Sequence, residues 1–326
     1  MDNIDRYEKQ IILPMIGNEN QLKFKNSKII IIGLGGIGCP VLSYLSSMGF
    51  MNISILDYDK VELSNLHRQI IYTENDISKF KTECAKQFCI DRNSLINIKE
   101  YNVKITNNNS LKILENYDII VDCTDNIYTR YVINDACVIL NKKYFFGSAI
   151  GTSGQIGVLN YNNNSPCLRC IYNNNTNDSC NSNGVLGVIP NLIGNLMAIE
   201  IVKIVCNIEN ELTNKLLNYD IVHGFYKMNI VKNINCLVCS KNKSININNY
   251  TKLNIYDKTC NISYEYSTTN KNNVININEN EIIDDLYEKY KIDTNDLIFE
   301  CINKIKSRIL VSKLRQSGKN NVWFLI

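Results

Sequence analysis

Four cysteines form two widely separated pairs with the spacing of a zinc site. Cys167 and Cys170 lie in the segment PCLRC, and Cys236 and Cys239 lie in NCLVC. Two C-x2-C pairs suit tetrahedral zinc, with each thiolate sulfur about 2.3 Å from the metal. All four ligands are present, so we expect a closed structural zinc site that joins two distant segments of one domain. Unmetallated thiols are the alternative.

A fifth cysteine, Cys180, is placed like a nucleophile rather than a metal ligand. It lies in DSCNSNGVLG, a stretch rich in glycine and asparagine that predicts a mobile loop. Such loops can bring a nucleophile to a substrate. The alternative is an inert exposed cysteine, since no neighbour in the sequence would activate its thiol. Six further cysteines fall on apolar positions and are predicted to fill the core: Cys39, Cys84, Cys89, Cys123, Cys137 and Cys206.

A glycine-rich turn precedes these cysteines. The segment GLGGIG places glycines at 33, 35, 36 and 38, between a β-branched strand at 28–32 and a helix at 39–48. Glycines allow a tight turn and a close approach of the backbone to phosphate, which the helix N-terminus then binds. Asp57 and Asp59 follow the next strand, where a carboxylate can accept hydrogen bonds from ribose hydroxyls. The turn therefore indicates a nucleotide site.

The polar residues that follow favour ATP over the nicotinamide cofactor of a dehydrogenase. Arg68 and Lys81 can offset the charge of phosphates, and Asp125, at the carboxyl end of a strand, can bind Mg²⁺. Each charge taken singly has a solvated surface residue as its alternative. The predicted nucleotide ligands are Gly33, Gly35, Gly36, Gly38, Asp57, Asp59, Asn65, Arg68, Gln69, Lys81, Asp125 and Asn126.

The bulk composition excludes several classes of protein. The net charge of +3 over 326 residues gives no basic field for nucleic acid, and no apolar run of membrane-spanning length is evident. The only histidines, His67 and His223, leave little material for a Cys2His2 zinc site or a Ser-His-Asp triad. A polar start and thirteen cysteines, an odd number, predict a reducing, cytoplasmic compartment.

Strands alternate with helices along most of the chain, which predicts a doubly wound, Rossmann-like α/β sheet. A polar stretch after Ser240 predicts a boundary between a nucleotide-binding domain at 1–242 and a second domain at 243–326. The predicted strands are 28–32, 53–57, 98–103, 117–123, 144–149 and 155–160; the predicted helices are 39–48, 78–92, 110–116, 128–140 and 192–205, after a mostly helical 1–27.

Several motifs together resemble the ubiquitin-activating-like adenylyltransferases, the ThiF/MoeB/HesA superfamily. They occur in family order over about residues 1–240: RYEKQIILPMIG, GLGGIGCP, DYDKVELSNLHRQ, DCTDNIYTRYVINDAC, PCLRCIY, NGVLGVIPNLIGNLMAIEIVK and CLVC. Two departures are mild. Lys9 stands where the family has arginine, and DISKFK lacks the usual glycine and proline before Lys81.

The resemblance implies a homodimer that uses ATP to adenylate the C-terminal glycine of a ubiquitin-like sulfur carrier ending in Gly-Gly. By motif, Asp59 would bind ribose, Asp125 would bind magnesium, and Arg6 would reach the nucleotide of the partner subunit. The phosphates would lie on Asn65, Arg68 and Lys81. Cys180 would form a thioester or an acyl disulfide with the carrier. A cysteine desulfurase is the expected sulfur donor.

The segment from residue 243 onward resembles a degenerate rhodanese-like domain. Cys301 aligns with the persulfide-carrying cysteine of that fold, ahead of a helix predicted at 307–317. Lys304 stands where the persulfide loop usually has glycine, although Lys304 and Lys306 could hold a persulfide by charge. An inactive docking domain is the alternative. The combination of both domains resembles family members that act in tRNA thiolation and molybdenum-cofactor synthesis.

Two other functions remain open at the level of sequence. The first is a thiamine-pathway member of the same family, which would not need the tail. The second is a non-catalytic scaffold that pairs with an active subunit. Non-catalytic subunits of this kind typically lose the phosphate-binding cations and the metal-binding aspartate, whereas this chain keeps Arg6, Arg68, Lys81 and Asp125. This retention favours a catalyst.

Overall fold

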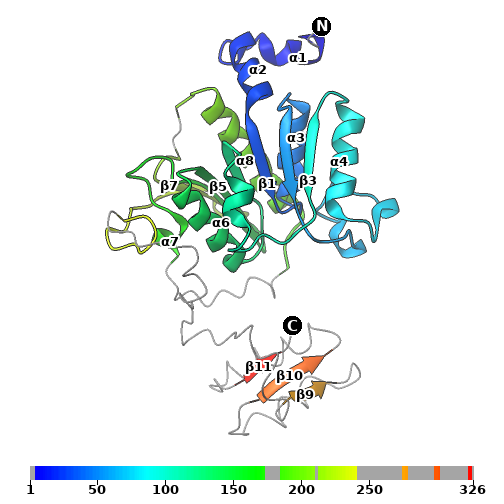
Figure 1. Cartoon of the computed structure of the whole chain (residues 1–326), viewed down its shortest axis with the longest axis vertical. Helices are drawn as coiled ribbons and strands as arrows, with labels where there is room; N and C mark the ends of the chain where they lie inside the picture. The colour runs from blue at the N-terminus through cyan, green and yellow to red at the C-terminus, as the bar shows by residue number, and fades with distance from the viewer. Residues whose placement is uncertain are drawn as a thin grey trace. The chain divides into compact units, whose positions relative to one another are not determined.

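The computed structural model describes residues 4–172, 184–209 and 212–240, together with three strands nearer the C-terminus (Figure 1). The chain divides into a larger unit, which holds these first three ranges, and a smaller unit, which holds the three strands. Cys180 and the predicted boundary at residue 242 lie outside the described residues. The boundary therefore stays a prediction.

The larger unit is built on one eight-stranded mixed sheet with the order β3-β2-β1-β4-β5-β6-β7-β8. Strands β1 to β5 run parallel, with β1 and β4 adjacent at the switch in strand order, and β6 to β8 continue the sheet antiparallel. The strands are β1 (Lys28–Ile32), β2 (Asn52–Leu56), β3 (Asn97–Tyr101), β4 (Ile119–Asp122), β5 (Lys143–Ile150), β6 (Ser153–Leu159), β7 (Lys215–Asp220) and β8 (Gly224–Asn229).

The Rossmann-like α/β fold predicted from the sequence is confirmed for the parallel half of the sheet. The six predicted strands match β1 to β6 with small shifts at their ends. Strands β7 and β8 were not predicted. Five of the six residues of β8 are exposed, so its sequence lacks the apolar pattern by which a buried strand is recognised.

Eight α-helices are described in the larger unit. Helix α3 packs against α4 and α8, while α5 packs against α6. The helices are α1 (Ile4–Ile11), α2 (Gly17–Asn26), α3 (Gly38–Ser47), α4 (Lys81–Arg92), α5 (Ser110–Leu114), α6 (Ile127–Ile139), α7 (Leu168–Ile171) and α8 (Val188–Val205), and two short 3₁₀ helices lie at Leu63–Asn65 and Glu74–Asp76.

The core lies around β1, whose isoleucines at 29–32 are at most 1% exposed. Burying one such side chain contributes about 1.5–3 kcal/mol. Helix α8 is long and apolar enough to cross a membrane by length and composition. Half of that helix is buried, however, and it packs on α3, β5 and β6, which are the contacts of a core helix.

Helices α3 and α8 approach closely because glycine stands at their contact. A Cβ built on Gly194 of α8 would overlap the carbonyl oxygen of Ile37, just before α3, and would press on Pro40. The first is a backbone atom and the second belongs to the rigid proline ring, so neither can rotate away. The position of α8 behind the glycine-rich turn therefore depends on a missing side chain.

The Gly194→Ala substitution should destabilise the protein by about 1–3 kcal/mol, the usual cost of overpacking a core. In an exposed helix the same change would be stabilising by about 1 kcal/mol, so the sign of the effect reports the helix contact. Urea unfolding measures it. Gly184→Ala is the matched control, because a Cβ there has nothing within 4 Å. Equal stability of the two variants would contradict the close approach.

The smaller unit contains three parallel strands in the order β11-β10-β9: β9 (Val274–Ile277), β10 (Leu297–Cys301) and β11 (Val322–Phe324). Parallel neighbours need long crossover connections, as in α/β domains. Cys301 is the last residue of the middle strand. The helix predicted at 307–317 lies outside the described residues.

Candidate functional site

The glycine-rich turn joins β1 to α3 at the carboxyl edge of the parallel strands. Gly33 has a φ of +89°, and a Cβ there would lie 2.8 Å from the carbonyl oxygen of Cys123, beyond β4. A Cβ on Gly38 would overlap the Gly33 oxygen. At Gly35 the nearest such contact is the Gln69 amide nitrogen at 3.8 Å. The glycines at 33 and 38 thus allow close packing, whereas Gly35 leaves room for a ligand at the start of α3.

Asp57, predicted as a nucleotide ligand, shapes the turn through hydrogen bonds to backbone N–H groups. Its two carboxylate oxygens accept the backbone N–H of Leu34 at 2.7 Å and that of Asp59 at 2.8 Å. Burial raises the pKa of the Asp57 carboxyl despite the nearby Lys81 and these two amides. Asp59 is the more exposed of the two aspartates, so it is the better placed to meet a ribose.

Lys81 begins α4 and brings a buried ammonium to the same edge. Its Nζ lies 3.1 Å from the Asp59 carboxylate, while the lysine side chain is 7% exposed. The Tyr72 hydroxyl donates to the Leu34 carbonyl at 3.1 Å and so fixes the glycine-rich turn against this segment. Two of the residues predicted for phosphate and ribose, Lys81 and Asp59, are therefore in direct contact.

The LSNLHRQ segment forms a 3₁₀ turn that presents Arg68 beside the glycines. The Asn65 side-chain oxygen accepts the Glu62 N–H at 3.3 Å. The backbone carbonyl of Asn65 accepts the N–H groups of Arg68 and Gln69. A Cβ on Gly36 would lie 3.3 Å from Arg68 Cγ. The segment thus places the stem of Arg68 beside the turn, while its guanidinium donates to the Ser64 carbonyl at 2.9 Å.

Gln69 carries an unsatisfied polar atom into this region. The residue is 3% exposed, and its Oε1 has no hydrogen-bond partner within the described parts of the chain. Its amide nitrogen faces Gly35. An unpartnered buried acceptor next to the open glycine fits a ligand that donates hydrogen bonds, such as a nucleoside.

The start of α8 closes one side of the site, a role that the sequence did not reveal. The Asn191 amide donates to the carbonyl of Arg68 at 2.9 Å and to that of Gly187 at 2.8 Å. A Cβ on Gly36 would lie 3.0 Å from Pro190. The motif NGVLGVIPN signalled this segment, but nothing in its letters indicated that Asn191 ties it to the backbone of Arg68.

The carboxyl end of β4 carries the predicted magnesium ligand. Asp125 is exposed, as a metal ligand that shares its ion with phosphates needs to be. Asn126 accepts the Thr129 N–H at 2.8 Å and caps α6, so its oxygen has a structural task beside the predicted ligand role. One free carboxylate fits magnesium, which typically takes one or two carboxylates plus the phosphates of its substrate.

The predicted nucleotide ligands lie on segments that leave one edge of the sheet, whereas Arg6 lies apart from them. Ile32, Leu56 and Asp122 pair in register at the ends of β1, β2 and β4, so the segments that follow them meet there. Arg6 donates to the carbonyl of Arg92 at 2.8 Å, at the far end of α4 from Lys81. A helix of 12 residues is about 18 Å long. Arg6 therefore does not reach the site of its own chain.

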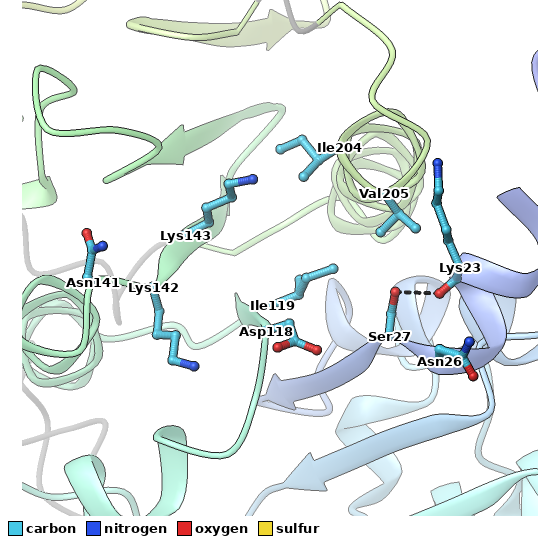
Figure 2. Close-up of a pocket in the computed structure, with 10 residues that line it drawn as sticks. All are labelled: Lys23, Asn26, Ser27, Asp118, Ile119, Asn141, Lys142, Lys143, Ile204 and Val205. Atoms are coloured by element: carbon cyan, nitrogen blue, oxygen red, sulfur yellow. Dashed lines mark hydrogen bonds between the residues drawn. The ribbon is translucent and has the colours of Figure 1, made fainter.

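A surface hollow lies at the opposite edge of the parallel strands. Figure 2 shows lysines at 23, 142 and 143 around it, with Asp118, Ile119 and Val205. These residues border the beginnings of β1, β4 and β5 rather than their carboxyl ends. None of the predicted site residues lines the hollow, so it is separate from the nucleotide site.

The four paired cysteines meet as predicted. Their sulfur atoms all lie within 4.8 Å of one another, with Cys167 Sγ 3.7 Å from Cys236 Sγ and Cys170 Sγ 3.4 Å from Cys239 Sγ. Tetrahedral thiolates about 2.3 Å from zinc would be about 3.8 Å apart, so the cluster fits that ion. Hydrogen bonds from Cys167 and Cys239 lower the pKa of the Cys170 thiol.

Helix α6 connects this cluster to the nucleotide edge. Asn134 accepts the Leu168 N–H at 2.7 Å, and Arg169 binds the buried Asp135 carboxylate in a bidentate pair at 2.7–2.9 Å. The first cysteine pair is thus anchored to the helix that begins directly after Asp125 and Asn126. The cysteine cluster therefore supports the segment that carries Asp125 and Asn126 through contacts with α6.

The Cys236→Ser substitution should remove bound zinc and lower the melting temperature, because a thiolate ligand is lost and three thiols remain buried together. Zinc content by mass spectrometry and thermal unfolding measure the two effects. Cys206→Ser is the control: that cysteine lies outside the cluster, so its variant should keep the zinc content of the parent. A wild-type protein without zinc after growth in zinc-supplemented medium would contradict the assignment.

Comparison with known proteins agrees with the geometry. The ThiF family matches residues 7–241. The chain is 40% identical over 282 residues to "Adenylyltransferase and sulfurtransferase MOCS3" of Aedes aegypti, covering 85% of this chain and 62% of that protein. Against the protein of the same name from Dictyostelium discoideum it is 36% identical over 349 residues, with 98% and 81% covered. A "Sulfur carrier protein adenylyltransferase" of Thermus thermophilus is 38% identical, with 73% and 91% covered.

Solved structures show the same fold. The microcin C7 biosynthetic enzyme MccB with N-formylated MccA aligns with a TM-score of 0.66 and 25% identity, over 73% of this chain and 76% of that one. Escherichia coli MccB with ATP aligns at 0.60 and 25% identity, over 68% and 69%. The chain spans about three fifths of the first curated relative. The matched segment contains the glycine-rich turn, Arg68, Lys81, Asp125 and the four clustered cysteines, and the chain belongs to the ThiF family.

Proposed function

We propose that this protein uses ATP to adenylate the C-terminal glycine of a ubiquitin-like sulfur carrier. One observation carries the proposal. The segments that carry Arg68, Lys81 and Asp125 follow the carboxyl ends of β2 and β4, next to the glycine-rich turn that follows β1. Two cations and a metal-binding carboxylate are what attack on an α-phosphate needs. The relative named as a sulfur carrier protein adenylyltransferase supports the choice of substrate, and those named as adenylyltransferases support the reaction.

In the proposed reaction the phosphates of ATP lie over the glycine-rich turn, with the ribose on Asp59. The carrier carboxylate attacks the α-phosphorus; a new P–O bond forms, and the bond to pyrophosphate breaks. Arg68 and Lys81 stabilise the charge on the phosphates. Asp125 would hold magnesium, which neutralises phosphate charge when bound. Closing the site at the start of α8 limits access of water.

The second half of the proposal concerns sulfur. The outer sulfur of a persulfide on Cys301 would displace AMP, or would displace Cys180 from a thioester formed first, and in either case an acyl disulfide results. A second thiol would then attack the Cys301 sulfur, which releases the thiocarboxylate on the carrier and leaves a disulfide between the two thiols. The position of Cys301 at the end of the middle parallel strand supports a rhodanese-like role for the smaller unit. Relatives named as sulfurtransferases point the same way. A cysteine desulfurase would supply the sulfur in the cytoplasm.

A homodimer is also part of the proposal, with Arg6 completing the site of the partner subunit. The placement of Arg6 about one helix length from Lys81 supports a role in another chain. Two alternatives are less favoured. A non-catalytic scaffold would not need the convergent cations, and a thiamine-pathway enzyme would not need the smaller unit.

The Asp125→Ala substitution should lower carrier-dependent ATP–pyrophosphate exchange by about 10²–10³-fold, the usual effect of losing one preorganised electrostatic group. Asp118→Ala is the matched control. Asp118 is exposed and lies directly before β4, where its carboxylate accepts the Lys28 N–H at 3.2 Å. Asp125 follows the other end of the same strand. Exchange should require a carrier ending in Gly-Gly and should disappear when that ending is deleted. Full activity of Asp125→Ala would show that the magnesium assignment is wrong.

The Gly35→Ala substitution should separate binding from folding. A Cβ at residue 35 meets only ordinary contacts, so the melting temperature should stay that of the parent. Because the methyl group occupies the face offered to phosphate, ATP affinity should fall at least about tenfold, which corresponds to about 1.4 kcal/mol. Isothermal titration with ATP measures it, with Gly184→Ala as the control. Unchanged affinity would place the phosphates elsewhere.

A further inference from the structure

Arg130 is a buried cation that the sequence and the proposed reaction leave without a task. It lies in α6 and is 7% exposed. Within the described residues no carboxylate lies within ion-pair distance of its guanidinium, unlike that of Arg169. Burying a charge is unfavourable, so the hydrogen bonds of this side chain, the Phe146 ring 5.6 Å from its guanidinium carbon and the charge of the nearby Asp122 must compensate.

The guanidinium of Arg130 joins two strand ends. Its Nε donates to the Thr124 carbonyl at 3.2 Å, and its Nη2 donates to the same oxygen and to the Gly147 carbonyl at 2.9 Å. Thr124 follows β4, whereas Gly147 lies within β5 against Met197 and Ile193 of α8. Arg130 thus ties the turn after β4 to the packed layer behind the site.

A buried carboxylate holds the same turn from the other side. Asp122 is fully buried and accepts the Thr124 N–H at 2.9 Å and the Thr124 hydroxyl at 2.7 Å on one oxygen. Its second oxygen accepts the Tyr144 hydroxyl. The N–H, the hydroxyl and the carbonyl of Thr124 are therefore all bonded to one of two buried, oppositely charged side chains.

We propose that Arg130 is a positioning residue, which together with Asp122 fixes the Thr124 turn so that Asp125 meets the metal and the phosphates. The inference rests on the proposed function for the role of Asp125. The geometry itself does not depend on the proposed function: the Arg130 guanidinium donates to the Thr124 carbonyl, and the Asp122 carboxylate accepts the Thr124 N–H and hydroxyl. The next residue along the chain is the exposed Asp125 itself.

Two variants separate the fork from the charge. Arg130→Lys keeps the charge, but a single ammonium cannot reproduce the donor fork to both carbonyls; Arg130→Met keeps the apolar stem and loses the charge. Phe24→Leu is the control for stability alone. Phe24 is fully buried in α2 and stacks on Phe50 with a centroid distance of 4.6 Å.

The first measurement is hydrogen–deuterium exchange of peptides covering residues 120–130 in the full chain without nucleotide. Both Arg130 variants should exchange faster in this segment, while Phe24→Leu should not. The second measurement is the affinity for Mn²⁺ in the presence of a non-hydrolysable ATP analogue, monitored by electron paramagnetic resonance. Both Arg130 variants should bind Mn²⁺ about 10- to 100-fold more weakly, as for other residues that orient a metal ligand.

Unchanged Mn²⁺ affinity in both variants, with a loss of melting temperature like that of Phe24→Leu, would overturn the inference. Full recovery in Arg130→Lys would also overturn it, because the charge rather than the fork would then matter. A wild-type protein that binds no Mn²⁺ with the analogue would instead refute the proposed function. In that case the exchange data still decide whether Arg130 holds the turn.

Discussion

The arrangement of this site depends on one backbone contact, between the exits of β1 and β4. Gly33 can turn with a positive φ directly against the Cys123 carbonyl only because it has no Cβ. This contact brings the glycine-rich turn next to the Thr124–Asp125 turn. The N–H groups proposed to bind phosphate and the carboxylate proposed to bind a metal therefore share one edge of the sheet. The cations at 68 and 81 come to that edge from the chain that follows β2.

Much of the parallel sheet could be predicted, because buried strands and a glycine turn leave clear marks in a sequence. The same is true of the clustered cysteines, whose type and spacing define their chemistry. The antiparallel strands β7 and β8 were both missed. For β8 the reason is that a strand with mostly exposed side chains has no apolar pattern. Cys180 and the helix expected after Cys301 lie outside the described residues, so those expectations stay predictions.

Polar residues were harder to interpret than apolar ones. Asp57 and Asn126 were predicted as nucleotide ligands, yet their oxygens bind backbone N–H groups that shape the site. Arg130 and Asn191 do comparable work and were not singled out. A sequence motif records that a polar residue is present. It does not record whether the side chain contacts the ligand or instead bonds to the backbone of the site. That choice depends on contacts between distant segments of the chain.

The burial of the core cysteines bears on chemoselectivity. Cys39 lies in the first turn of α3 at the glycine-rich turn, and Cys123 lies beneath it, so both are near the proposed position of an acyl-adenylate. Burial raises the pKa of the Cys39 thiol to about 12 and that of Cys123 well above its ordinary value. At neutral pH both thiols therefore stay protonated, whereas the thiolate is the form that attacks acyl groups. An activated carboxylate can thus be formed beside two cysteines without acylating either of them.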